Sequence, residues 1–281
     1  MAMTHDQWQA VRTTFRETGD RFAEMVCAAR DPHALATVSW TVAETAAHVA
    51  ALASLATHVV APDDVPALKE ISDSIPTTTC DTVADLNALT LRHFTERDLV
   101  VLAHRLRTDI GLLLRITRDL DPGQTVEWLG ESRVPVCGIV AHLLNELHIH
   151  GRDIARAGRT PWEVRPEDAA LFFELFLVGL TRHGYGRLLD NGEPPRERRI
   201  AVAFRSPYTT PVTLVLQRGL VAVEEPGRDS DVRLSFDPVT LNLMLFGRLS
   251  KARSVLTGKV VIGGRRPWLL PAFLRKLRLP S

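Results

Sequence analysis

Apolar residues recur at helical spacing through the first two-thirds of the chain and predict four long amphipathic helices. We expect these helices over residues 6–30, 44–60, 82–120 and 135–157. The third helix should break near Thr95. Thr41 and Glu44 form a capping-box pair at the start of the second helix, and Gly158 is placed to cap the end of the fourth. Four such helices with polar connections are typical of a four-helix bundle, which we expect over residues 1–165.

A further helical pattern over residues 166–187 leads into a linker signal at residues 190–195 (DNGEPP), after which apolar positions alternate with period two. We expect strands over residues 199–204, 212–217, 221–225, 232–236 and 259–262, and helices over 238–246 and 269–277. Arg218-Gly219 suggests a hairpin turn. These patterns predict a connecting helix and linker over 166–195 and a small α+β domain over 196–281.

Composition narrows the class of protein without naming a function. The 281 residues are 45% hydrophobic and 24% charged, which is the balance of a folded globular chain rather than a disordered one. No apolar run is long enough to span a membrane, and the polar N-terminus predicts no secretory signal. Three widely spaced cysteines argue against a disulfide scaffold, so we expect a cytoplasmic protein.

Charge is uneven although the net charge is only +1. No acidic residue follows Asp237, whereas nine basic residues do: Arg248, Lys251, Arg253, Lys259, Arg265, Arg266, Arg275, Lys276 and Arg278. This stretch is either a solvated basic surface, a site for an anionic small molecule, or, less favoured, a surface for an anionic membrane or nucleic acid. Nucleic acid ranks last because no interleaved aromatic motif accompanies the charge.

The fourth predicted helix carries a stripe of possible metal ligands. His142, Glu146 and His150 are four residues apart, so they share one helix face, and Asp153 follows three residues later on the same side. His148 lies roughly opposite and is expected to be a surface or packing residue. A Glu/His pair at this spacing is also common on plain helix surfaces. If the stripe faces a bundle interior, burying it is costly unless the groups bind a metal or one another.

A third candidate ligand lies on the second helix. His48 is surrounded by alanine and valine in AAHVA (residues 46–50), where a lone histidine is usually a packed core residue. Together with Glu146 and His150, however, it gives the three protein ligands of an open catalytic zinc site, with the fourth position left for water or substrate.

Two segments resemble a known family. Residues 40–49 (WTVAETAAHV) are similar to the W-[ST]-x-x-[DE]-x-x-x-H-[VLI] signature of the mycothiol-dependent maleylpyruvate isomerases, within the DinB-like metalloproteins. Residues 146–155 (ELHIHGRDIA) are similar to that family's E-x-x-x-H-G-x-D-[LI]-[AV] element. The resemblance covers about residues 1–160 and implies a DinB-like four-helix bundle.

The resemblance also implies a ligand set. By position, His48, Glu146 and His150 would bind a divalent metal, most simply Zn²⁺. His142 is outside the motif and would lie beside the ligands or line the pocket. We expect Asp153 to hold His150, or an arginine such as Arg152, in place.

The C-terminal part resembles sterol carrier protein-like domains and the isomerases' own second domain. The resemblance is carried by residues 235–249 (SFDPVTLNLMLFGRL) and 258–263 (GKVVIG). It implies that Arg248 assists catalysis beside the metal, in a site between the two domains. The alternative is that Arg248 only caps its helix, because cations are favoured at a helix C-terminus.

These expectations define a function with two alternatives. The preferred hypothesis is that the protein is a zinc-dependent enzyme. It would activate a small thiol such as mycothiol for addition to an electrophilic, anionic small molecule. It would act as a maleylpyruvate-type cis-trans isomerase or as a thiol S-transferase. The alternatives are a non-catalytic small-molecule or lipid carrier, and a thiol-independent metalloenzyme of natural-product biosynthesis.

Overall fold

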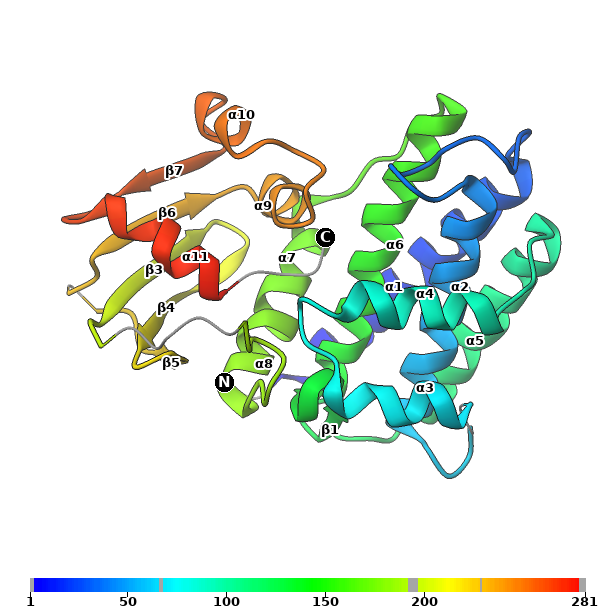
Figure 1. Cartoon of the computed structure of the whole chain (residues 1–281), viewed down its shortest axis with the longest axis horizontal. Helices are drawn as coiled ribbons and strands as arrows, with labels where there is room; N and C mark the ends of the chain where they lie inside the picture. The colour runs from blue at the N-terminus through cyan, green and yellow to red at the C-terminus, as the bar shows by residue number, and fades with distance from the viewer. Residues whose placement is uncertain (1–2, 66–67, 192–196, 228, 278–281) are drawn as a thin grey trace.

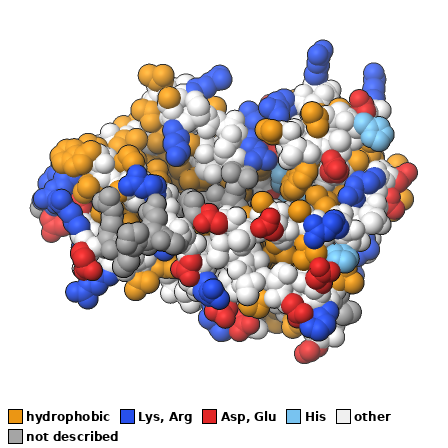
Figure 2. Space-filling view, viewed as in Figure 1, with side chains coloured by type: hydrophobic (Ala, Val, Ile, Leu, Met, Phe, Trp, Pro, Cys, Tyr) orange, Lys and Arg blue, Asp and Glu red, His pale blue; other side chains and the backbone are white. Residues whose placement is uncertain are grey.

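The structure, a computed structural model, describes residues 3–65, 68–191, 197–227 and 229–277. Figure 1 shows a helical region beside a region built on a β-sheet, which confirms the expected order of a helical part followed by an α+β part. Charged side chains of both signs are interspersed with hydrophobic ones over the face seen in Figure 2, in keeping with the small net charge. No described helix is long and apolar enough to cross a membrane.

Four long helices make up the core of the helical region. They are α1 (His5–Ala28), α2 (Val42–Val60), α5 (Leu99–Ile116) and α6 (Val136–Gly158). Both α1 and α2 pack against both α5 and α6, so the four close into a bundle around buried residues such as Phe15, Leu113 and Leu143. The capping box of Thr41 and Glu44 at the start of α2 is confirmed.

The connections of the bundle contain elements that the sequence pattern did not predict. The expected helix over 82–120 is divided into α4 (Val83–His93) and α5, with the break around Thr95 as expected. A short helix, α3 (Lys69–Ser74), precedes α4, and a hairpin of β1 (Thr125–Trp128) and β2 (Ser132–Pro135) joins α5 to α6.

The end of α6 differs from the expectation that Gly158 caps it. Gly158 is the last helical residue, and Arg159 takes the left-handed conformation, with φ 55°, and donates its backbone N–H to the carbonyls of Ala155 and Arg156. The expected cap was wrong by one residue because an arginine adopts the conformation for which glycine is the usual choice.

The helix expected over 166–187 is shorter and irregular. It consists of α7 (Pro166–Leu171), a π-helical turn η3 (Phe172–Leu177) and α8 (Val178–His183), and it ends at Gly184, which has φ 111°. Most of the predicted linker over 190–195 lies outside the described residues.

The C-terminal region is a five-stranded sheet with helices. The strands are β3 (Ile200–Ser206), β4 (Thr209–Gln217), β5 (Leu220–Glu224), β6 (Val232–Phe236) and β7 (Val260–Gly263). Their order is β5-β4-β3-β6-β7, antiparallel except for the β3–β6 pair. The expected turn at Arg218-Gly219 is confirmed, with positive φ at both residues. Three helices follow the first four strands: α9 (Pro238–Leu245), the unpredicted α10 (Lys251–Leu256), and α11 (Leu270–Lys276).

The segment α7–η3–α8 joins the sheet to the bundle. Phe173 of η3 packs against Phe204 and Phe236 of the sheet, with ring centroids 5.3 and 5.0 Å apart. On the other side, the side-chain amide of Asn242 in α9 donates to Asn145 of α6 and to the backbone carbonyl of Ala169. The chain leaving α9 is thereby held against α6, the helix that carries the candidate ligands.

Candidate metal centre

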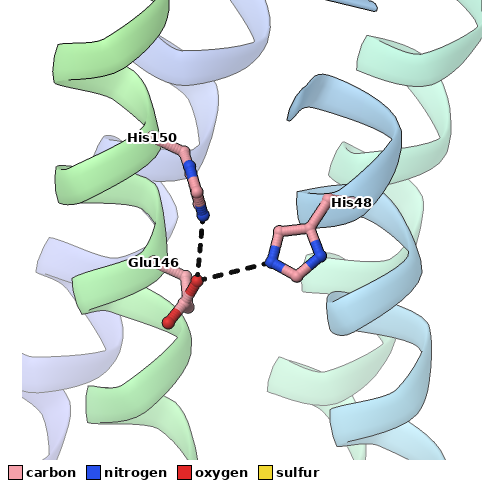
Figure 3. Close-up of side chains that lie close together, drawn as sticks. All are labelled: His48, Glu146 and His150. Atoms are coloured by element: carbon pink, nitrogen blue, oxygen red, sulfur yellow. Dashed lines mark ion pairs between the residues drawn. The ribbon is translucent and has the colours of Figure 1, made fainter. Parts of the chain in front are cut away.

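The structure brings His48, Glu146 and His150 together inside the helical bundle (Figure 3). His48 comes from α2 and the other two from α6, all three are buried, and their ligand atoms lie within 4.8 Å of one another. Glu146 Oε2 is 3.6 Å from His48 Nε2 and 3.3 Å from His150 Nε2. Two ligands each ~2.0–2.1 Å from a tetrahedral ion are roughly 3.3 Å apart, so this donor set fits a divalent ion such as zinc.

Local sequence explains why the two helices approach closely at this point. Most residues next to His48 along α2 are buried alanines, including Ala47 and Ala51, and their small side chains allow the helix to pack closely. Trp40, just before α2, covers the cluster: its ring centroid is 4.7 Å from that of His48 and 6.0 Å from that of His150. The capped start of α2 therefore fixes both a ligand and the indole above it.

Asp153 connects this cluster to the sheet region. Its Oδ2 is 3.3 Å from His150 Nδ1 and accepts a 2.8 Å hydrogen bond from Arg248 Nη2, while Arg248 Nε donates to both carboxylate oxygens. Arg248 Nη1 donates to the carbonyl of Phe246, and the intervening Gly247 has φ 68°. The arginine that Asp153 holds is thus Arg248, whereas Arg152, the example expected from sequence, lines a different cavity.

His142 lies one helical turn before Glu146 and faces its other oxygen. His142 Nε2 is 3.7 Å from Glu146 Oε1, and the imidazole packs between Trp128 and Phe176, with centroids 5.4 and 4.6 Å away. The structure therefore places His142 beside the possible ligands, as expected, with aromatic rings on its far side.

Electrostatics at the cluster depend on burial and close ion pairs. Burial favours the neutral form of Glu146, but contacts with His150, His48 and His142 outweigh it and hold the pKa of Glu146 well below its usual value. Burial lowers the pKa of His48 and of His142. For His150, burial also acts to lower the pKa, but Asp153 and Glu146 outweigh burial and raise it. Metal binding to this cluster would therefore compete with protonation of His150.

A cavity of about 620 Å³ opens onto the cluster and is lined by both regions of the protein. His48, Glu146 and His150 line it from the bundle, and Phe246, Gly247 and Arg248 from the chain after α9. Among the described residues of the basic C-terminal stretch, only Arg248 lines this cavity. Arg265 and Arg266 instead pair with Asp229 and Asp231.

Arg156 is a second cation of the cavity, and sequence reasoning missed it. It is exposed on α6, three residues after Asp153, and its Nη2 donates to the carbonyl of Ala36. Among the described residues, no carboxylate lies within ion-pair distance of its guanidinium, so its charge is available to an anion. Its three-residue spacing from Asp153 along α6 was the signal that could have identified it.

His148 is a packing residue and not a surface one. It is buried on the opposite face of α6, where a cavity of about 110 Å³ lies between α6, α7 and α9. Burial lowers the pKa of His148 to about 3, and its Nδ1 has no hydrogen-bond partner among the described residues. The imidazole is therefore neutral at physiological pH.

Comparisons with known proteins identify the fold. No protein-family model matches the chain, and no curated protein matches it. The crystal structure of the mycothiol-dependent maleylpyruvate isomerase is similar over 91% of this chain and 92% of that one, at 13% sequence identity and a TM-score of 0.48. A histidine-to-alanine mutant of that isomerase covers the same shares, at 14% identity and a TM-score of 0.50. The second likeness shows that the chain has a similar overall fold.

Proposed function

We propose that this chain is a metal-dependent enzyme that activates a small thiol for attack on an electrophilic small molecule. Residues 1–165 would form a DinB-like bundle, residues 196–281 a sterol carrier-like domain, and residues 166–195 their connection. The observation that carries the proposal is the buried His48, Glu146 and His150 cluster, which has the donors and spacing of an open catalytic zinc site at the wall of a large cavity.

The chemistry follows from what such a site supplies. A divalent metal held by these three residues lowers the pKa of a bound thiol, so that the thiolate nucleophile exists at neutral pH. The fold likeness to a mycothiol-dependent isomerase favours mycothiol as the thiol and a cis-trans isomerisation of the maleylpyruvate type. A thiol S-transferase would use the same activated nucleophile but release the adduct.

The neighbouring residues have separate tasks in this proposal. Asp153 holds His150 in the orientation in which Nε2 faces the cluster, and Trp40 shields the cluster from water. Arg248 acts first as a positioning residue, because its guanidinium is committed to Asp153 and to the carbonyl of Phe246. Its remaining N–H groups, with those of Arg156, are the donors for an anionic group of the substrate or thiol.

Metal analysis and thiol-dependent turnover test the proposal. Wild-type protein purified without chelator should carry close to one equivalent of zinc, and the His48→Ala and Glu146→Gln variants should lose it. His104→Ala, which removes an exposed imidazole from α5, is the matched control and should keep the metal. Conversion of a cis-enedione or cis-enoyl acid, followed by ultraviolet absorbance, should require both the metal and the thiol.

The three candidate functions give different results in that experiment. Wild-type protein that binds no divalent metal would exclude the enzyme and favour the carrier. Metal binding with turnover that is independent of any added thiol would favour the thiol-independent metalloenzyme.

A further inference from the structure

The cavity continues along α6 beyond the cluster of His48, Glu146 and His150, and its lining there is no longer charged. From Asp153 back to His142 the helix covers about 16 Å at 1.5 Å per residue. The charged side chains that line the cavity are Glu146, Asp153, Arg156 and Arg248. Three of these lie on α6 from residue 146 onward, and the fourth is bound to Asp153. The part of the cavity on the His142 side therefore carries no charged lining residue among those described.

The walls of that part are largely apolar, and we call it the apolar half of the cavity, although an uncharged polar residue, Thr181, also lines the cavity beside Leu180. It is lined by Leu52, Leu55, Trp128, Phe172, Phe176 and Leu180, which come from α2, β1, η3 and α8. His142 marks the boundary: it faces Glu146 on one side and packs between Trp128 and Phe176 on the other.

The π-helical turn η3 forms the aromatic part of this wall. Phe172 and Phe176 both line the cavity, with stacked rings 5.3 Å apart, while Phe173 between them packs on the sheet. A π turn within a helix is rare and is frequently found at functional sites. Here it directs two phenylalanines into the cavity without giving up the contact with the sheet.

The size of the cavity separates two classes of substrate. Its volume of about 620 Å³ is in the range of ~300–1,000 Å³ found for pockets that hold drug-sized ligands. A small dicarboxylate needs a cation beside each of its two carboxylates and would leave the apolar half unfilled. Water there would meet few polar partners, because aromatic rings and leucines line it.

We propose that the electrophilic substrate of this protein has an extended apolar body, either an alkyl chain or an aromatic ring system, that occupies the apolar half. The reactive carbon of the substrate then lies at the candidate metal site, and any anionic group of the substrate lies toward Arg156 and Arg248. This inference rests on the proposed function for the position of the reactive carbon. The apolar half itself is independent of the metal.

A series of metal-binding probes of increasing length tests this inference. Straight-chain alkyl hydroxamates of two to ten carbons would be titrated into zinc-loaded protein by calorimetry, with the hydroxamate anchored at the cluster. If the chain enters the apolar half, affinity should rise about three- to fourfold for each added methylene until the cavity is full. A flat response to chain length would overturn the inference.

One variant locates the effect in the apolar half. Leu52 is half-buried, lines the cavity and lies one turn after His48 on α2, so Leu52→Trp should fill part of the apolar half. Short hydroxamates should bind this variant as they bind wild type, whereas the rise in affinity with chain length should be lost. Val100→Trp, at an exposed site on α5, is the matched control. A gain that persists unchanged in Leu52→Trp would also overturn the inference.

A second measurement separates this inference from the metal proposal. Alkyl carboxylates of the same lengths would be used to displace the apolar dye Nile red from metal-free protein. Displacement that strengthens with chain length in wild type, and less so in Leu52→Trp, would support the apolar half even if the protein binds no zinc. Failure of both series would reject the apolar substrate and leave the zinc analysis to decide the proposed function.

Discussion

Glu146 is an ionised carboxylate whose side chain is only 10% exposed, and its close neighbours are the imidazoles of His48, His142 and His150. Taking a carboxylate out of water costs several kcal/mol unless an opposite charge lies beside it. Without a metal, His150 is the neighbour placed to supply that charge, because it lies between Glu146 and Asp153 and both carboxylates raise its pKa. A divalent cation balances both carboxylates directly, so the cluster favours binding one.

Functional residues could be predicted from sequence only where the pattern around them along one helix was informative. His48, Glu146 and His150 were identifiable because spacing on a helix fixes a face, and apolar neighbours imply that the face is buried. The partner of Asp153 could not be identified from sequence, because Arg248 is 95 residues away and only the tertiary fold brings it to α6. Arg156 was not predicted because its one sequence signal, the three-residue spacing from Asp153, is equally common for an arginine on an ordinary helix surface.

His148 predicts a measurable pH dependence of stability. Its pKa is about 3 in the folded protein and near 6.5 when unfolded, so the unfolded state binds the proton between these values. Stability is therefore complete above pH 6.5 and falls as the pH decreases toward 3. Between pH 7.5 and 5.5 this one group should cost wild type about 1.4 kcal/mol.

Urea unfolding at the two pH values measures this loss. The stability difference between wild type and His148→Gln should shrink by that amount on going to pH 5.5, since glutamine has no proton to gain. The His104→Gln variant, altered at an exposed imidazole, is the control. An unchanged difference for His148→Gln would mean that this imidazole is accessible to water in the folded protein.

At the level of elements, periodicity identified the long helices and the sheet strands but missed the short pieces. The hairpin of β1 and β2 has only four residues in each strand, and α10 has six, too few for a period to be recognisable. The π turn η3 lies within an apolar run, FFELFL, that is equally compatible with a regular helix. Its extra width is a response to packing against both α6 and the sheet.

Gly151, next to His150 on α6, gives a prediction at this scale. A Cβ at this position would overlap the indole of Trp162, whose Nε1 donates to the carbonyl of His148. Gly151→Ala should therefore displace Trp162 or shift α6, lowering the free energy of unfolding by about 1–3 kcal/mol. It should also weaken zinc binding, because any shift of α6 at this point moves His150.

Thermal unfolding and a zinc titration measure the two effects. Gly158→Ala is the matched control, because a Cβ there meets only Thr160 at 3.9 Å and alanine favours the helix. That variant should be as stable as wild type or slightly more so. If Gly151→Ala proved equally harmless, close packing of Trp162 on α6 would not be a requirement of the fold.

On the scale of the whole molecule, the helical region and the sheet region contact each other at the candidate metal site as well as through hydrophobic packing. Phe246, Gly247 and Arg248 follow α9 and reach α6 because Asn242 and the α7–η3–α8 segment hold α9 in place. Most of the basic C-terminal residues that suggested an anion site do not reach the cavity. Sequence reasoning could count these charges but could not tell which of them faces the bundle, since that depends on sheet topology.

The contact between Asp153 and Arg248 predicts that the sheet region controls the metal site through one ion pair. Asp153→Asn should lower zinc affinity about 10–100-fold, because His150 loses the group that orients it. Arg248→Gln should lower it less, and the double variant should be no weaker than Asp153→Asn alone. Such a cycle corresponds to a coupling energy of about 1–3 kcal/mol for residues that act as one unit. The Asp231–Arg266 pair, which lies within the sheet region, gives the control cycle and should leave zinc affinity unchanged. Additive losses of zinc affinity at Asp153 and Arg248 would instead show that Arg248 acts on the metal site independently of Asp153.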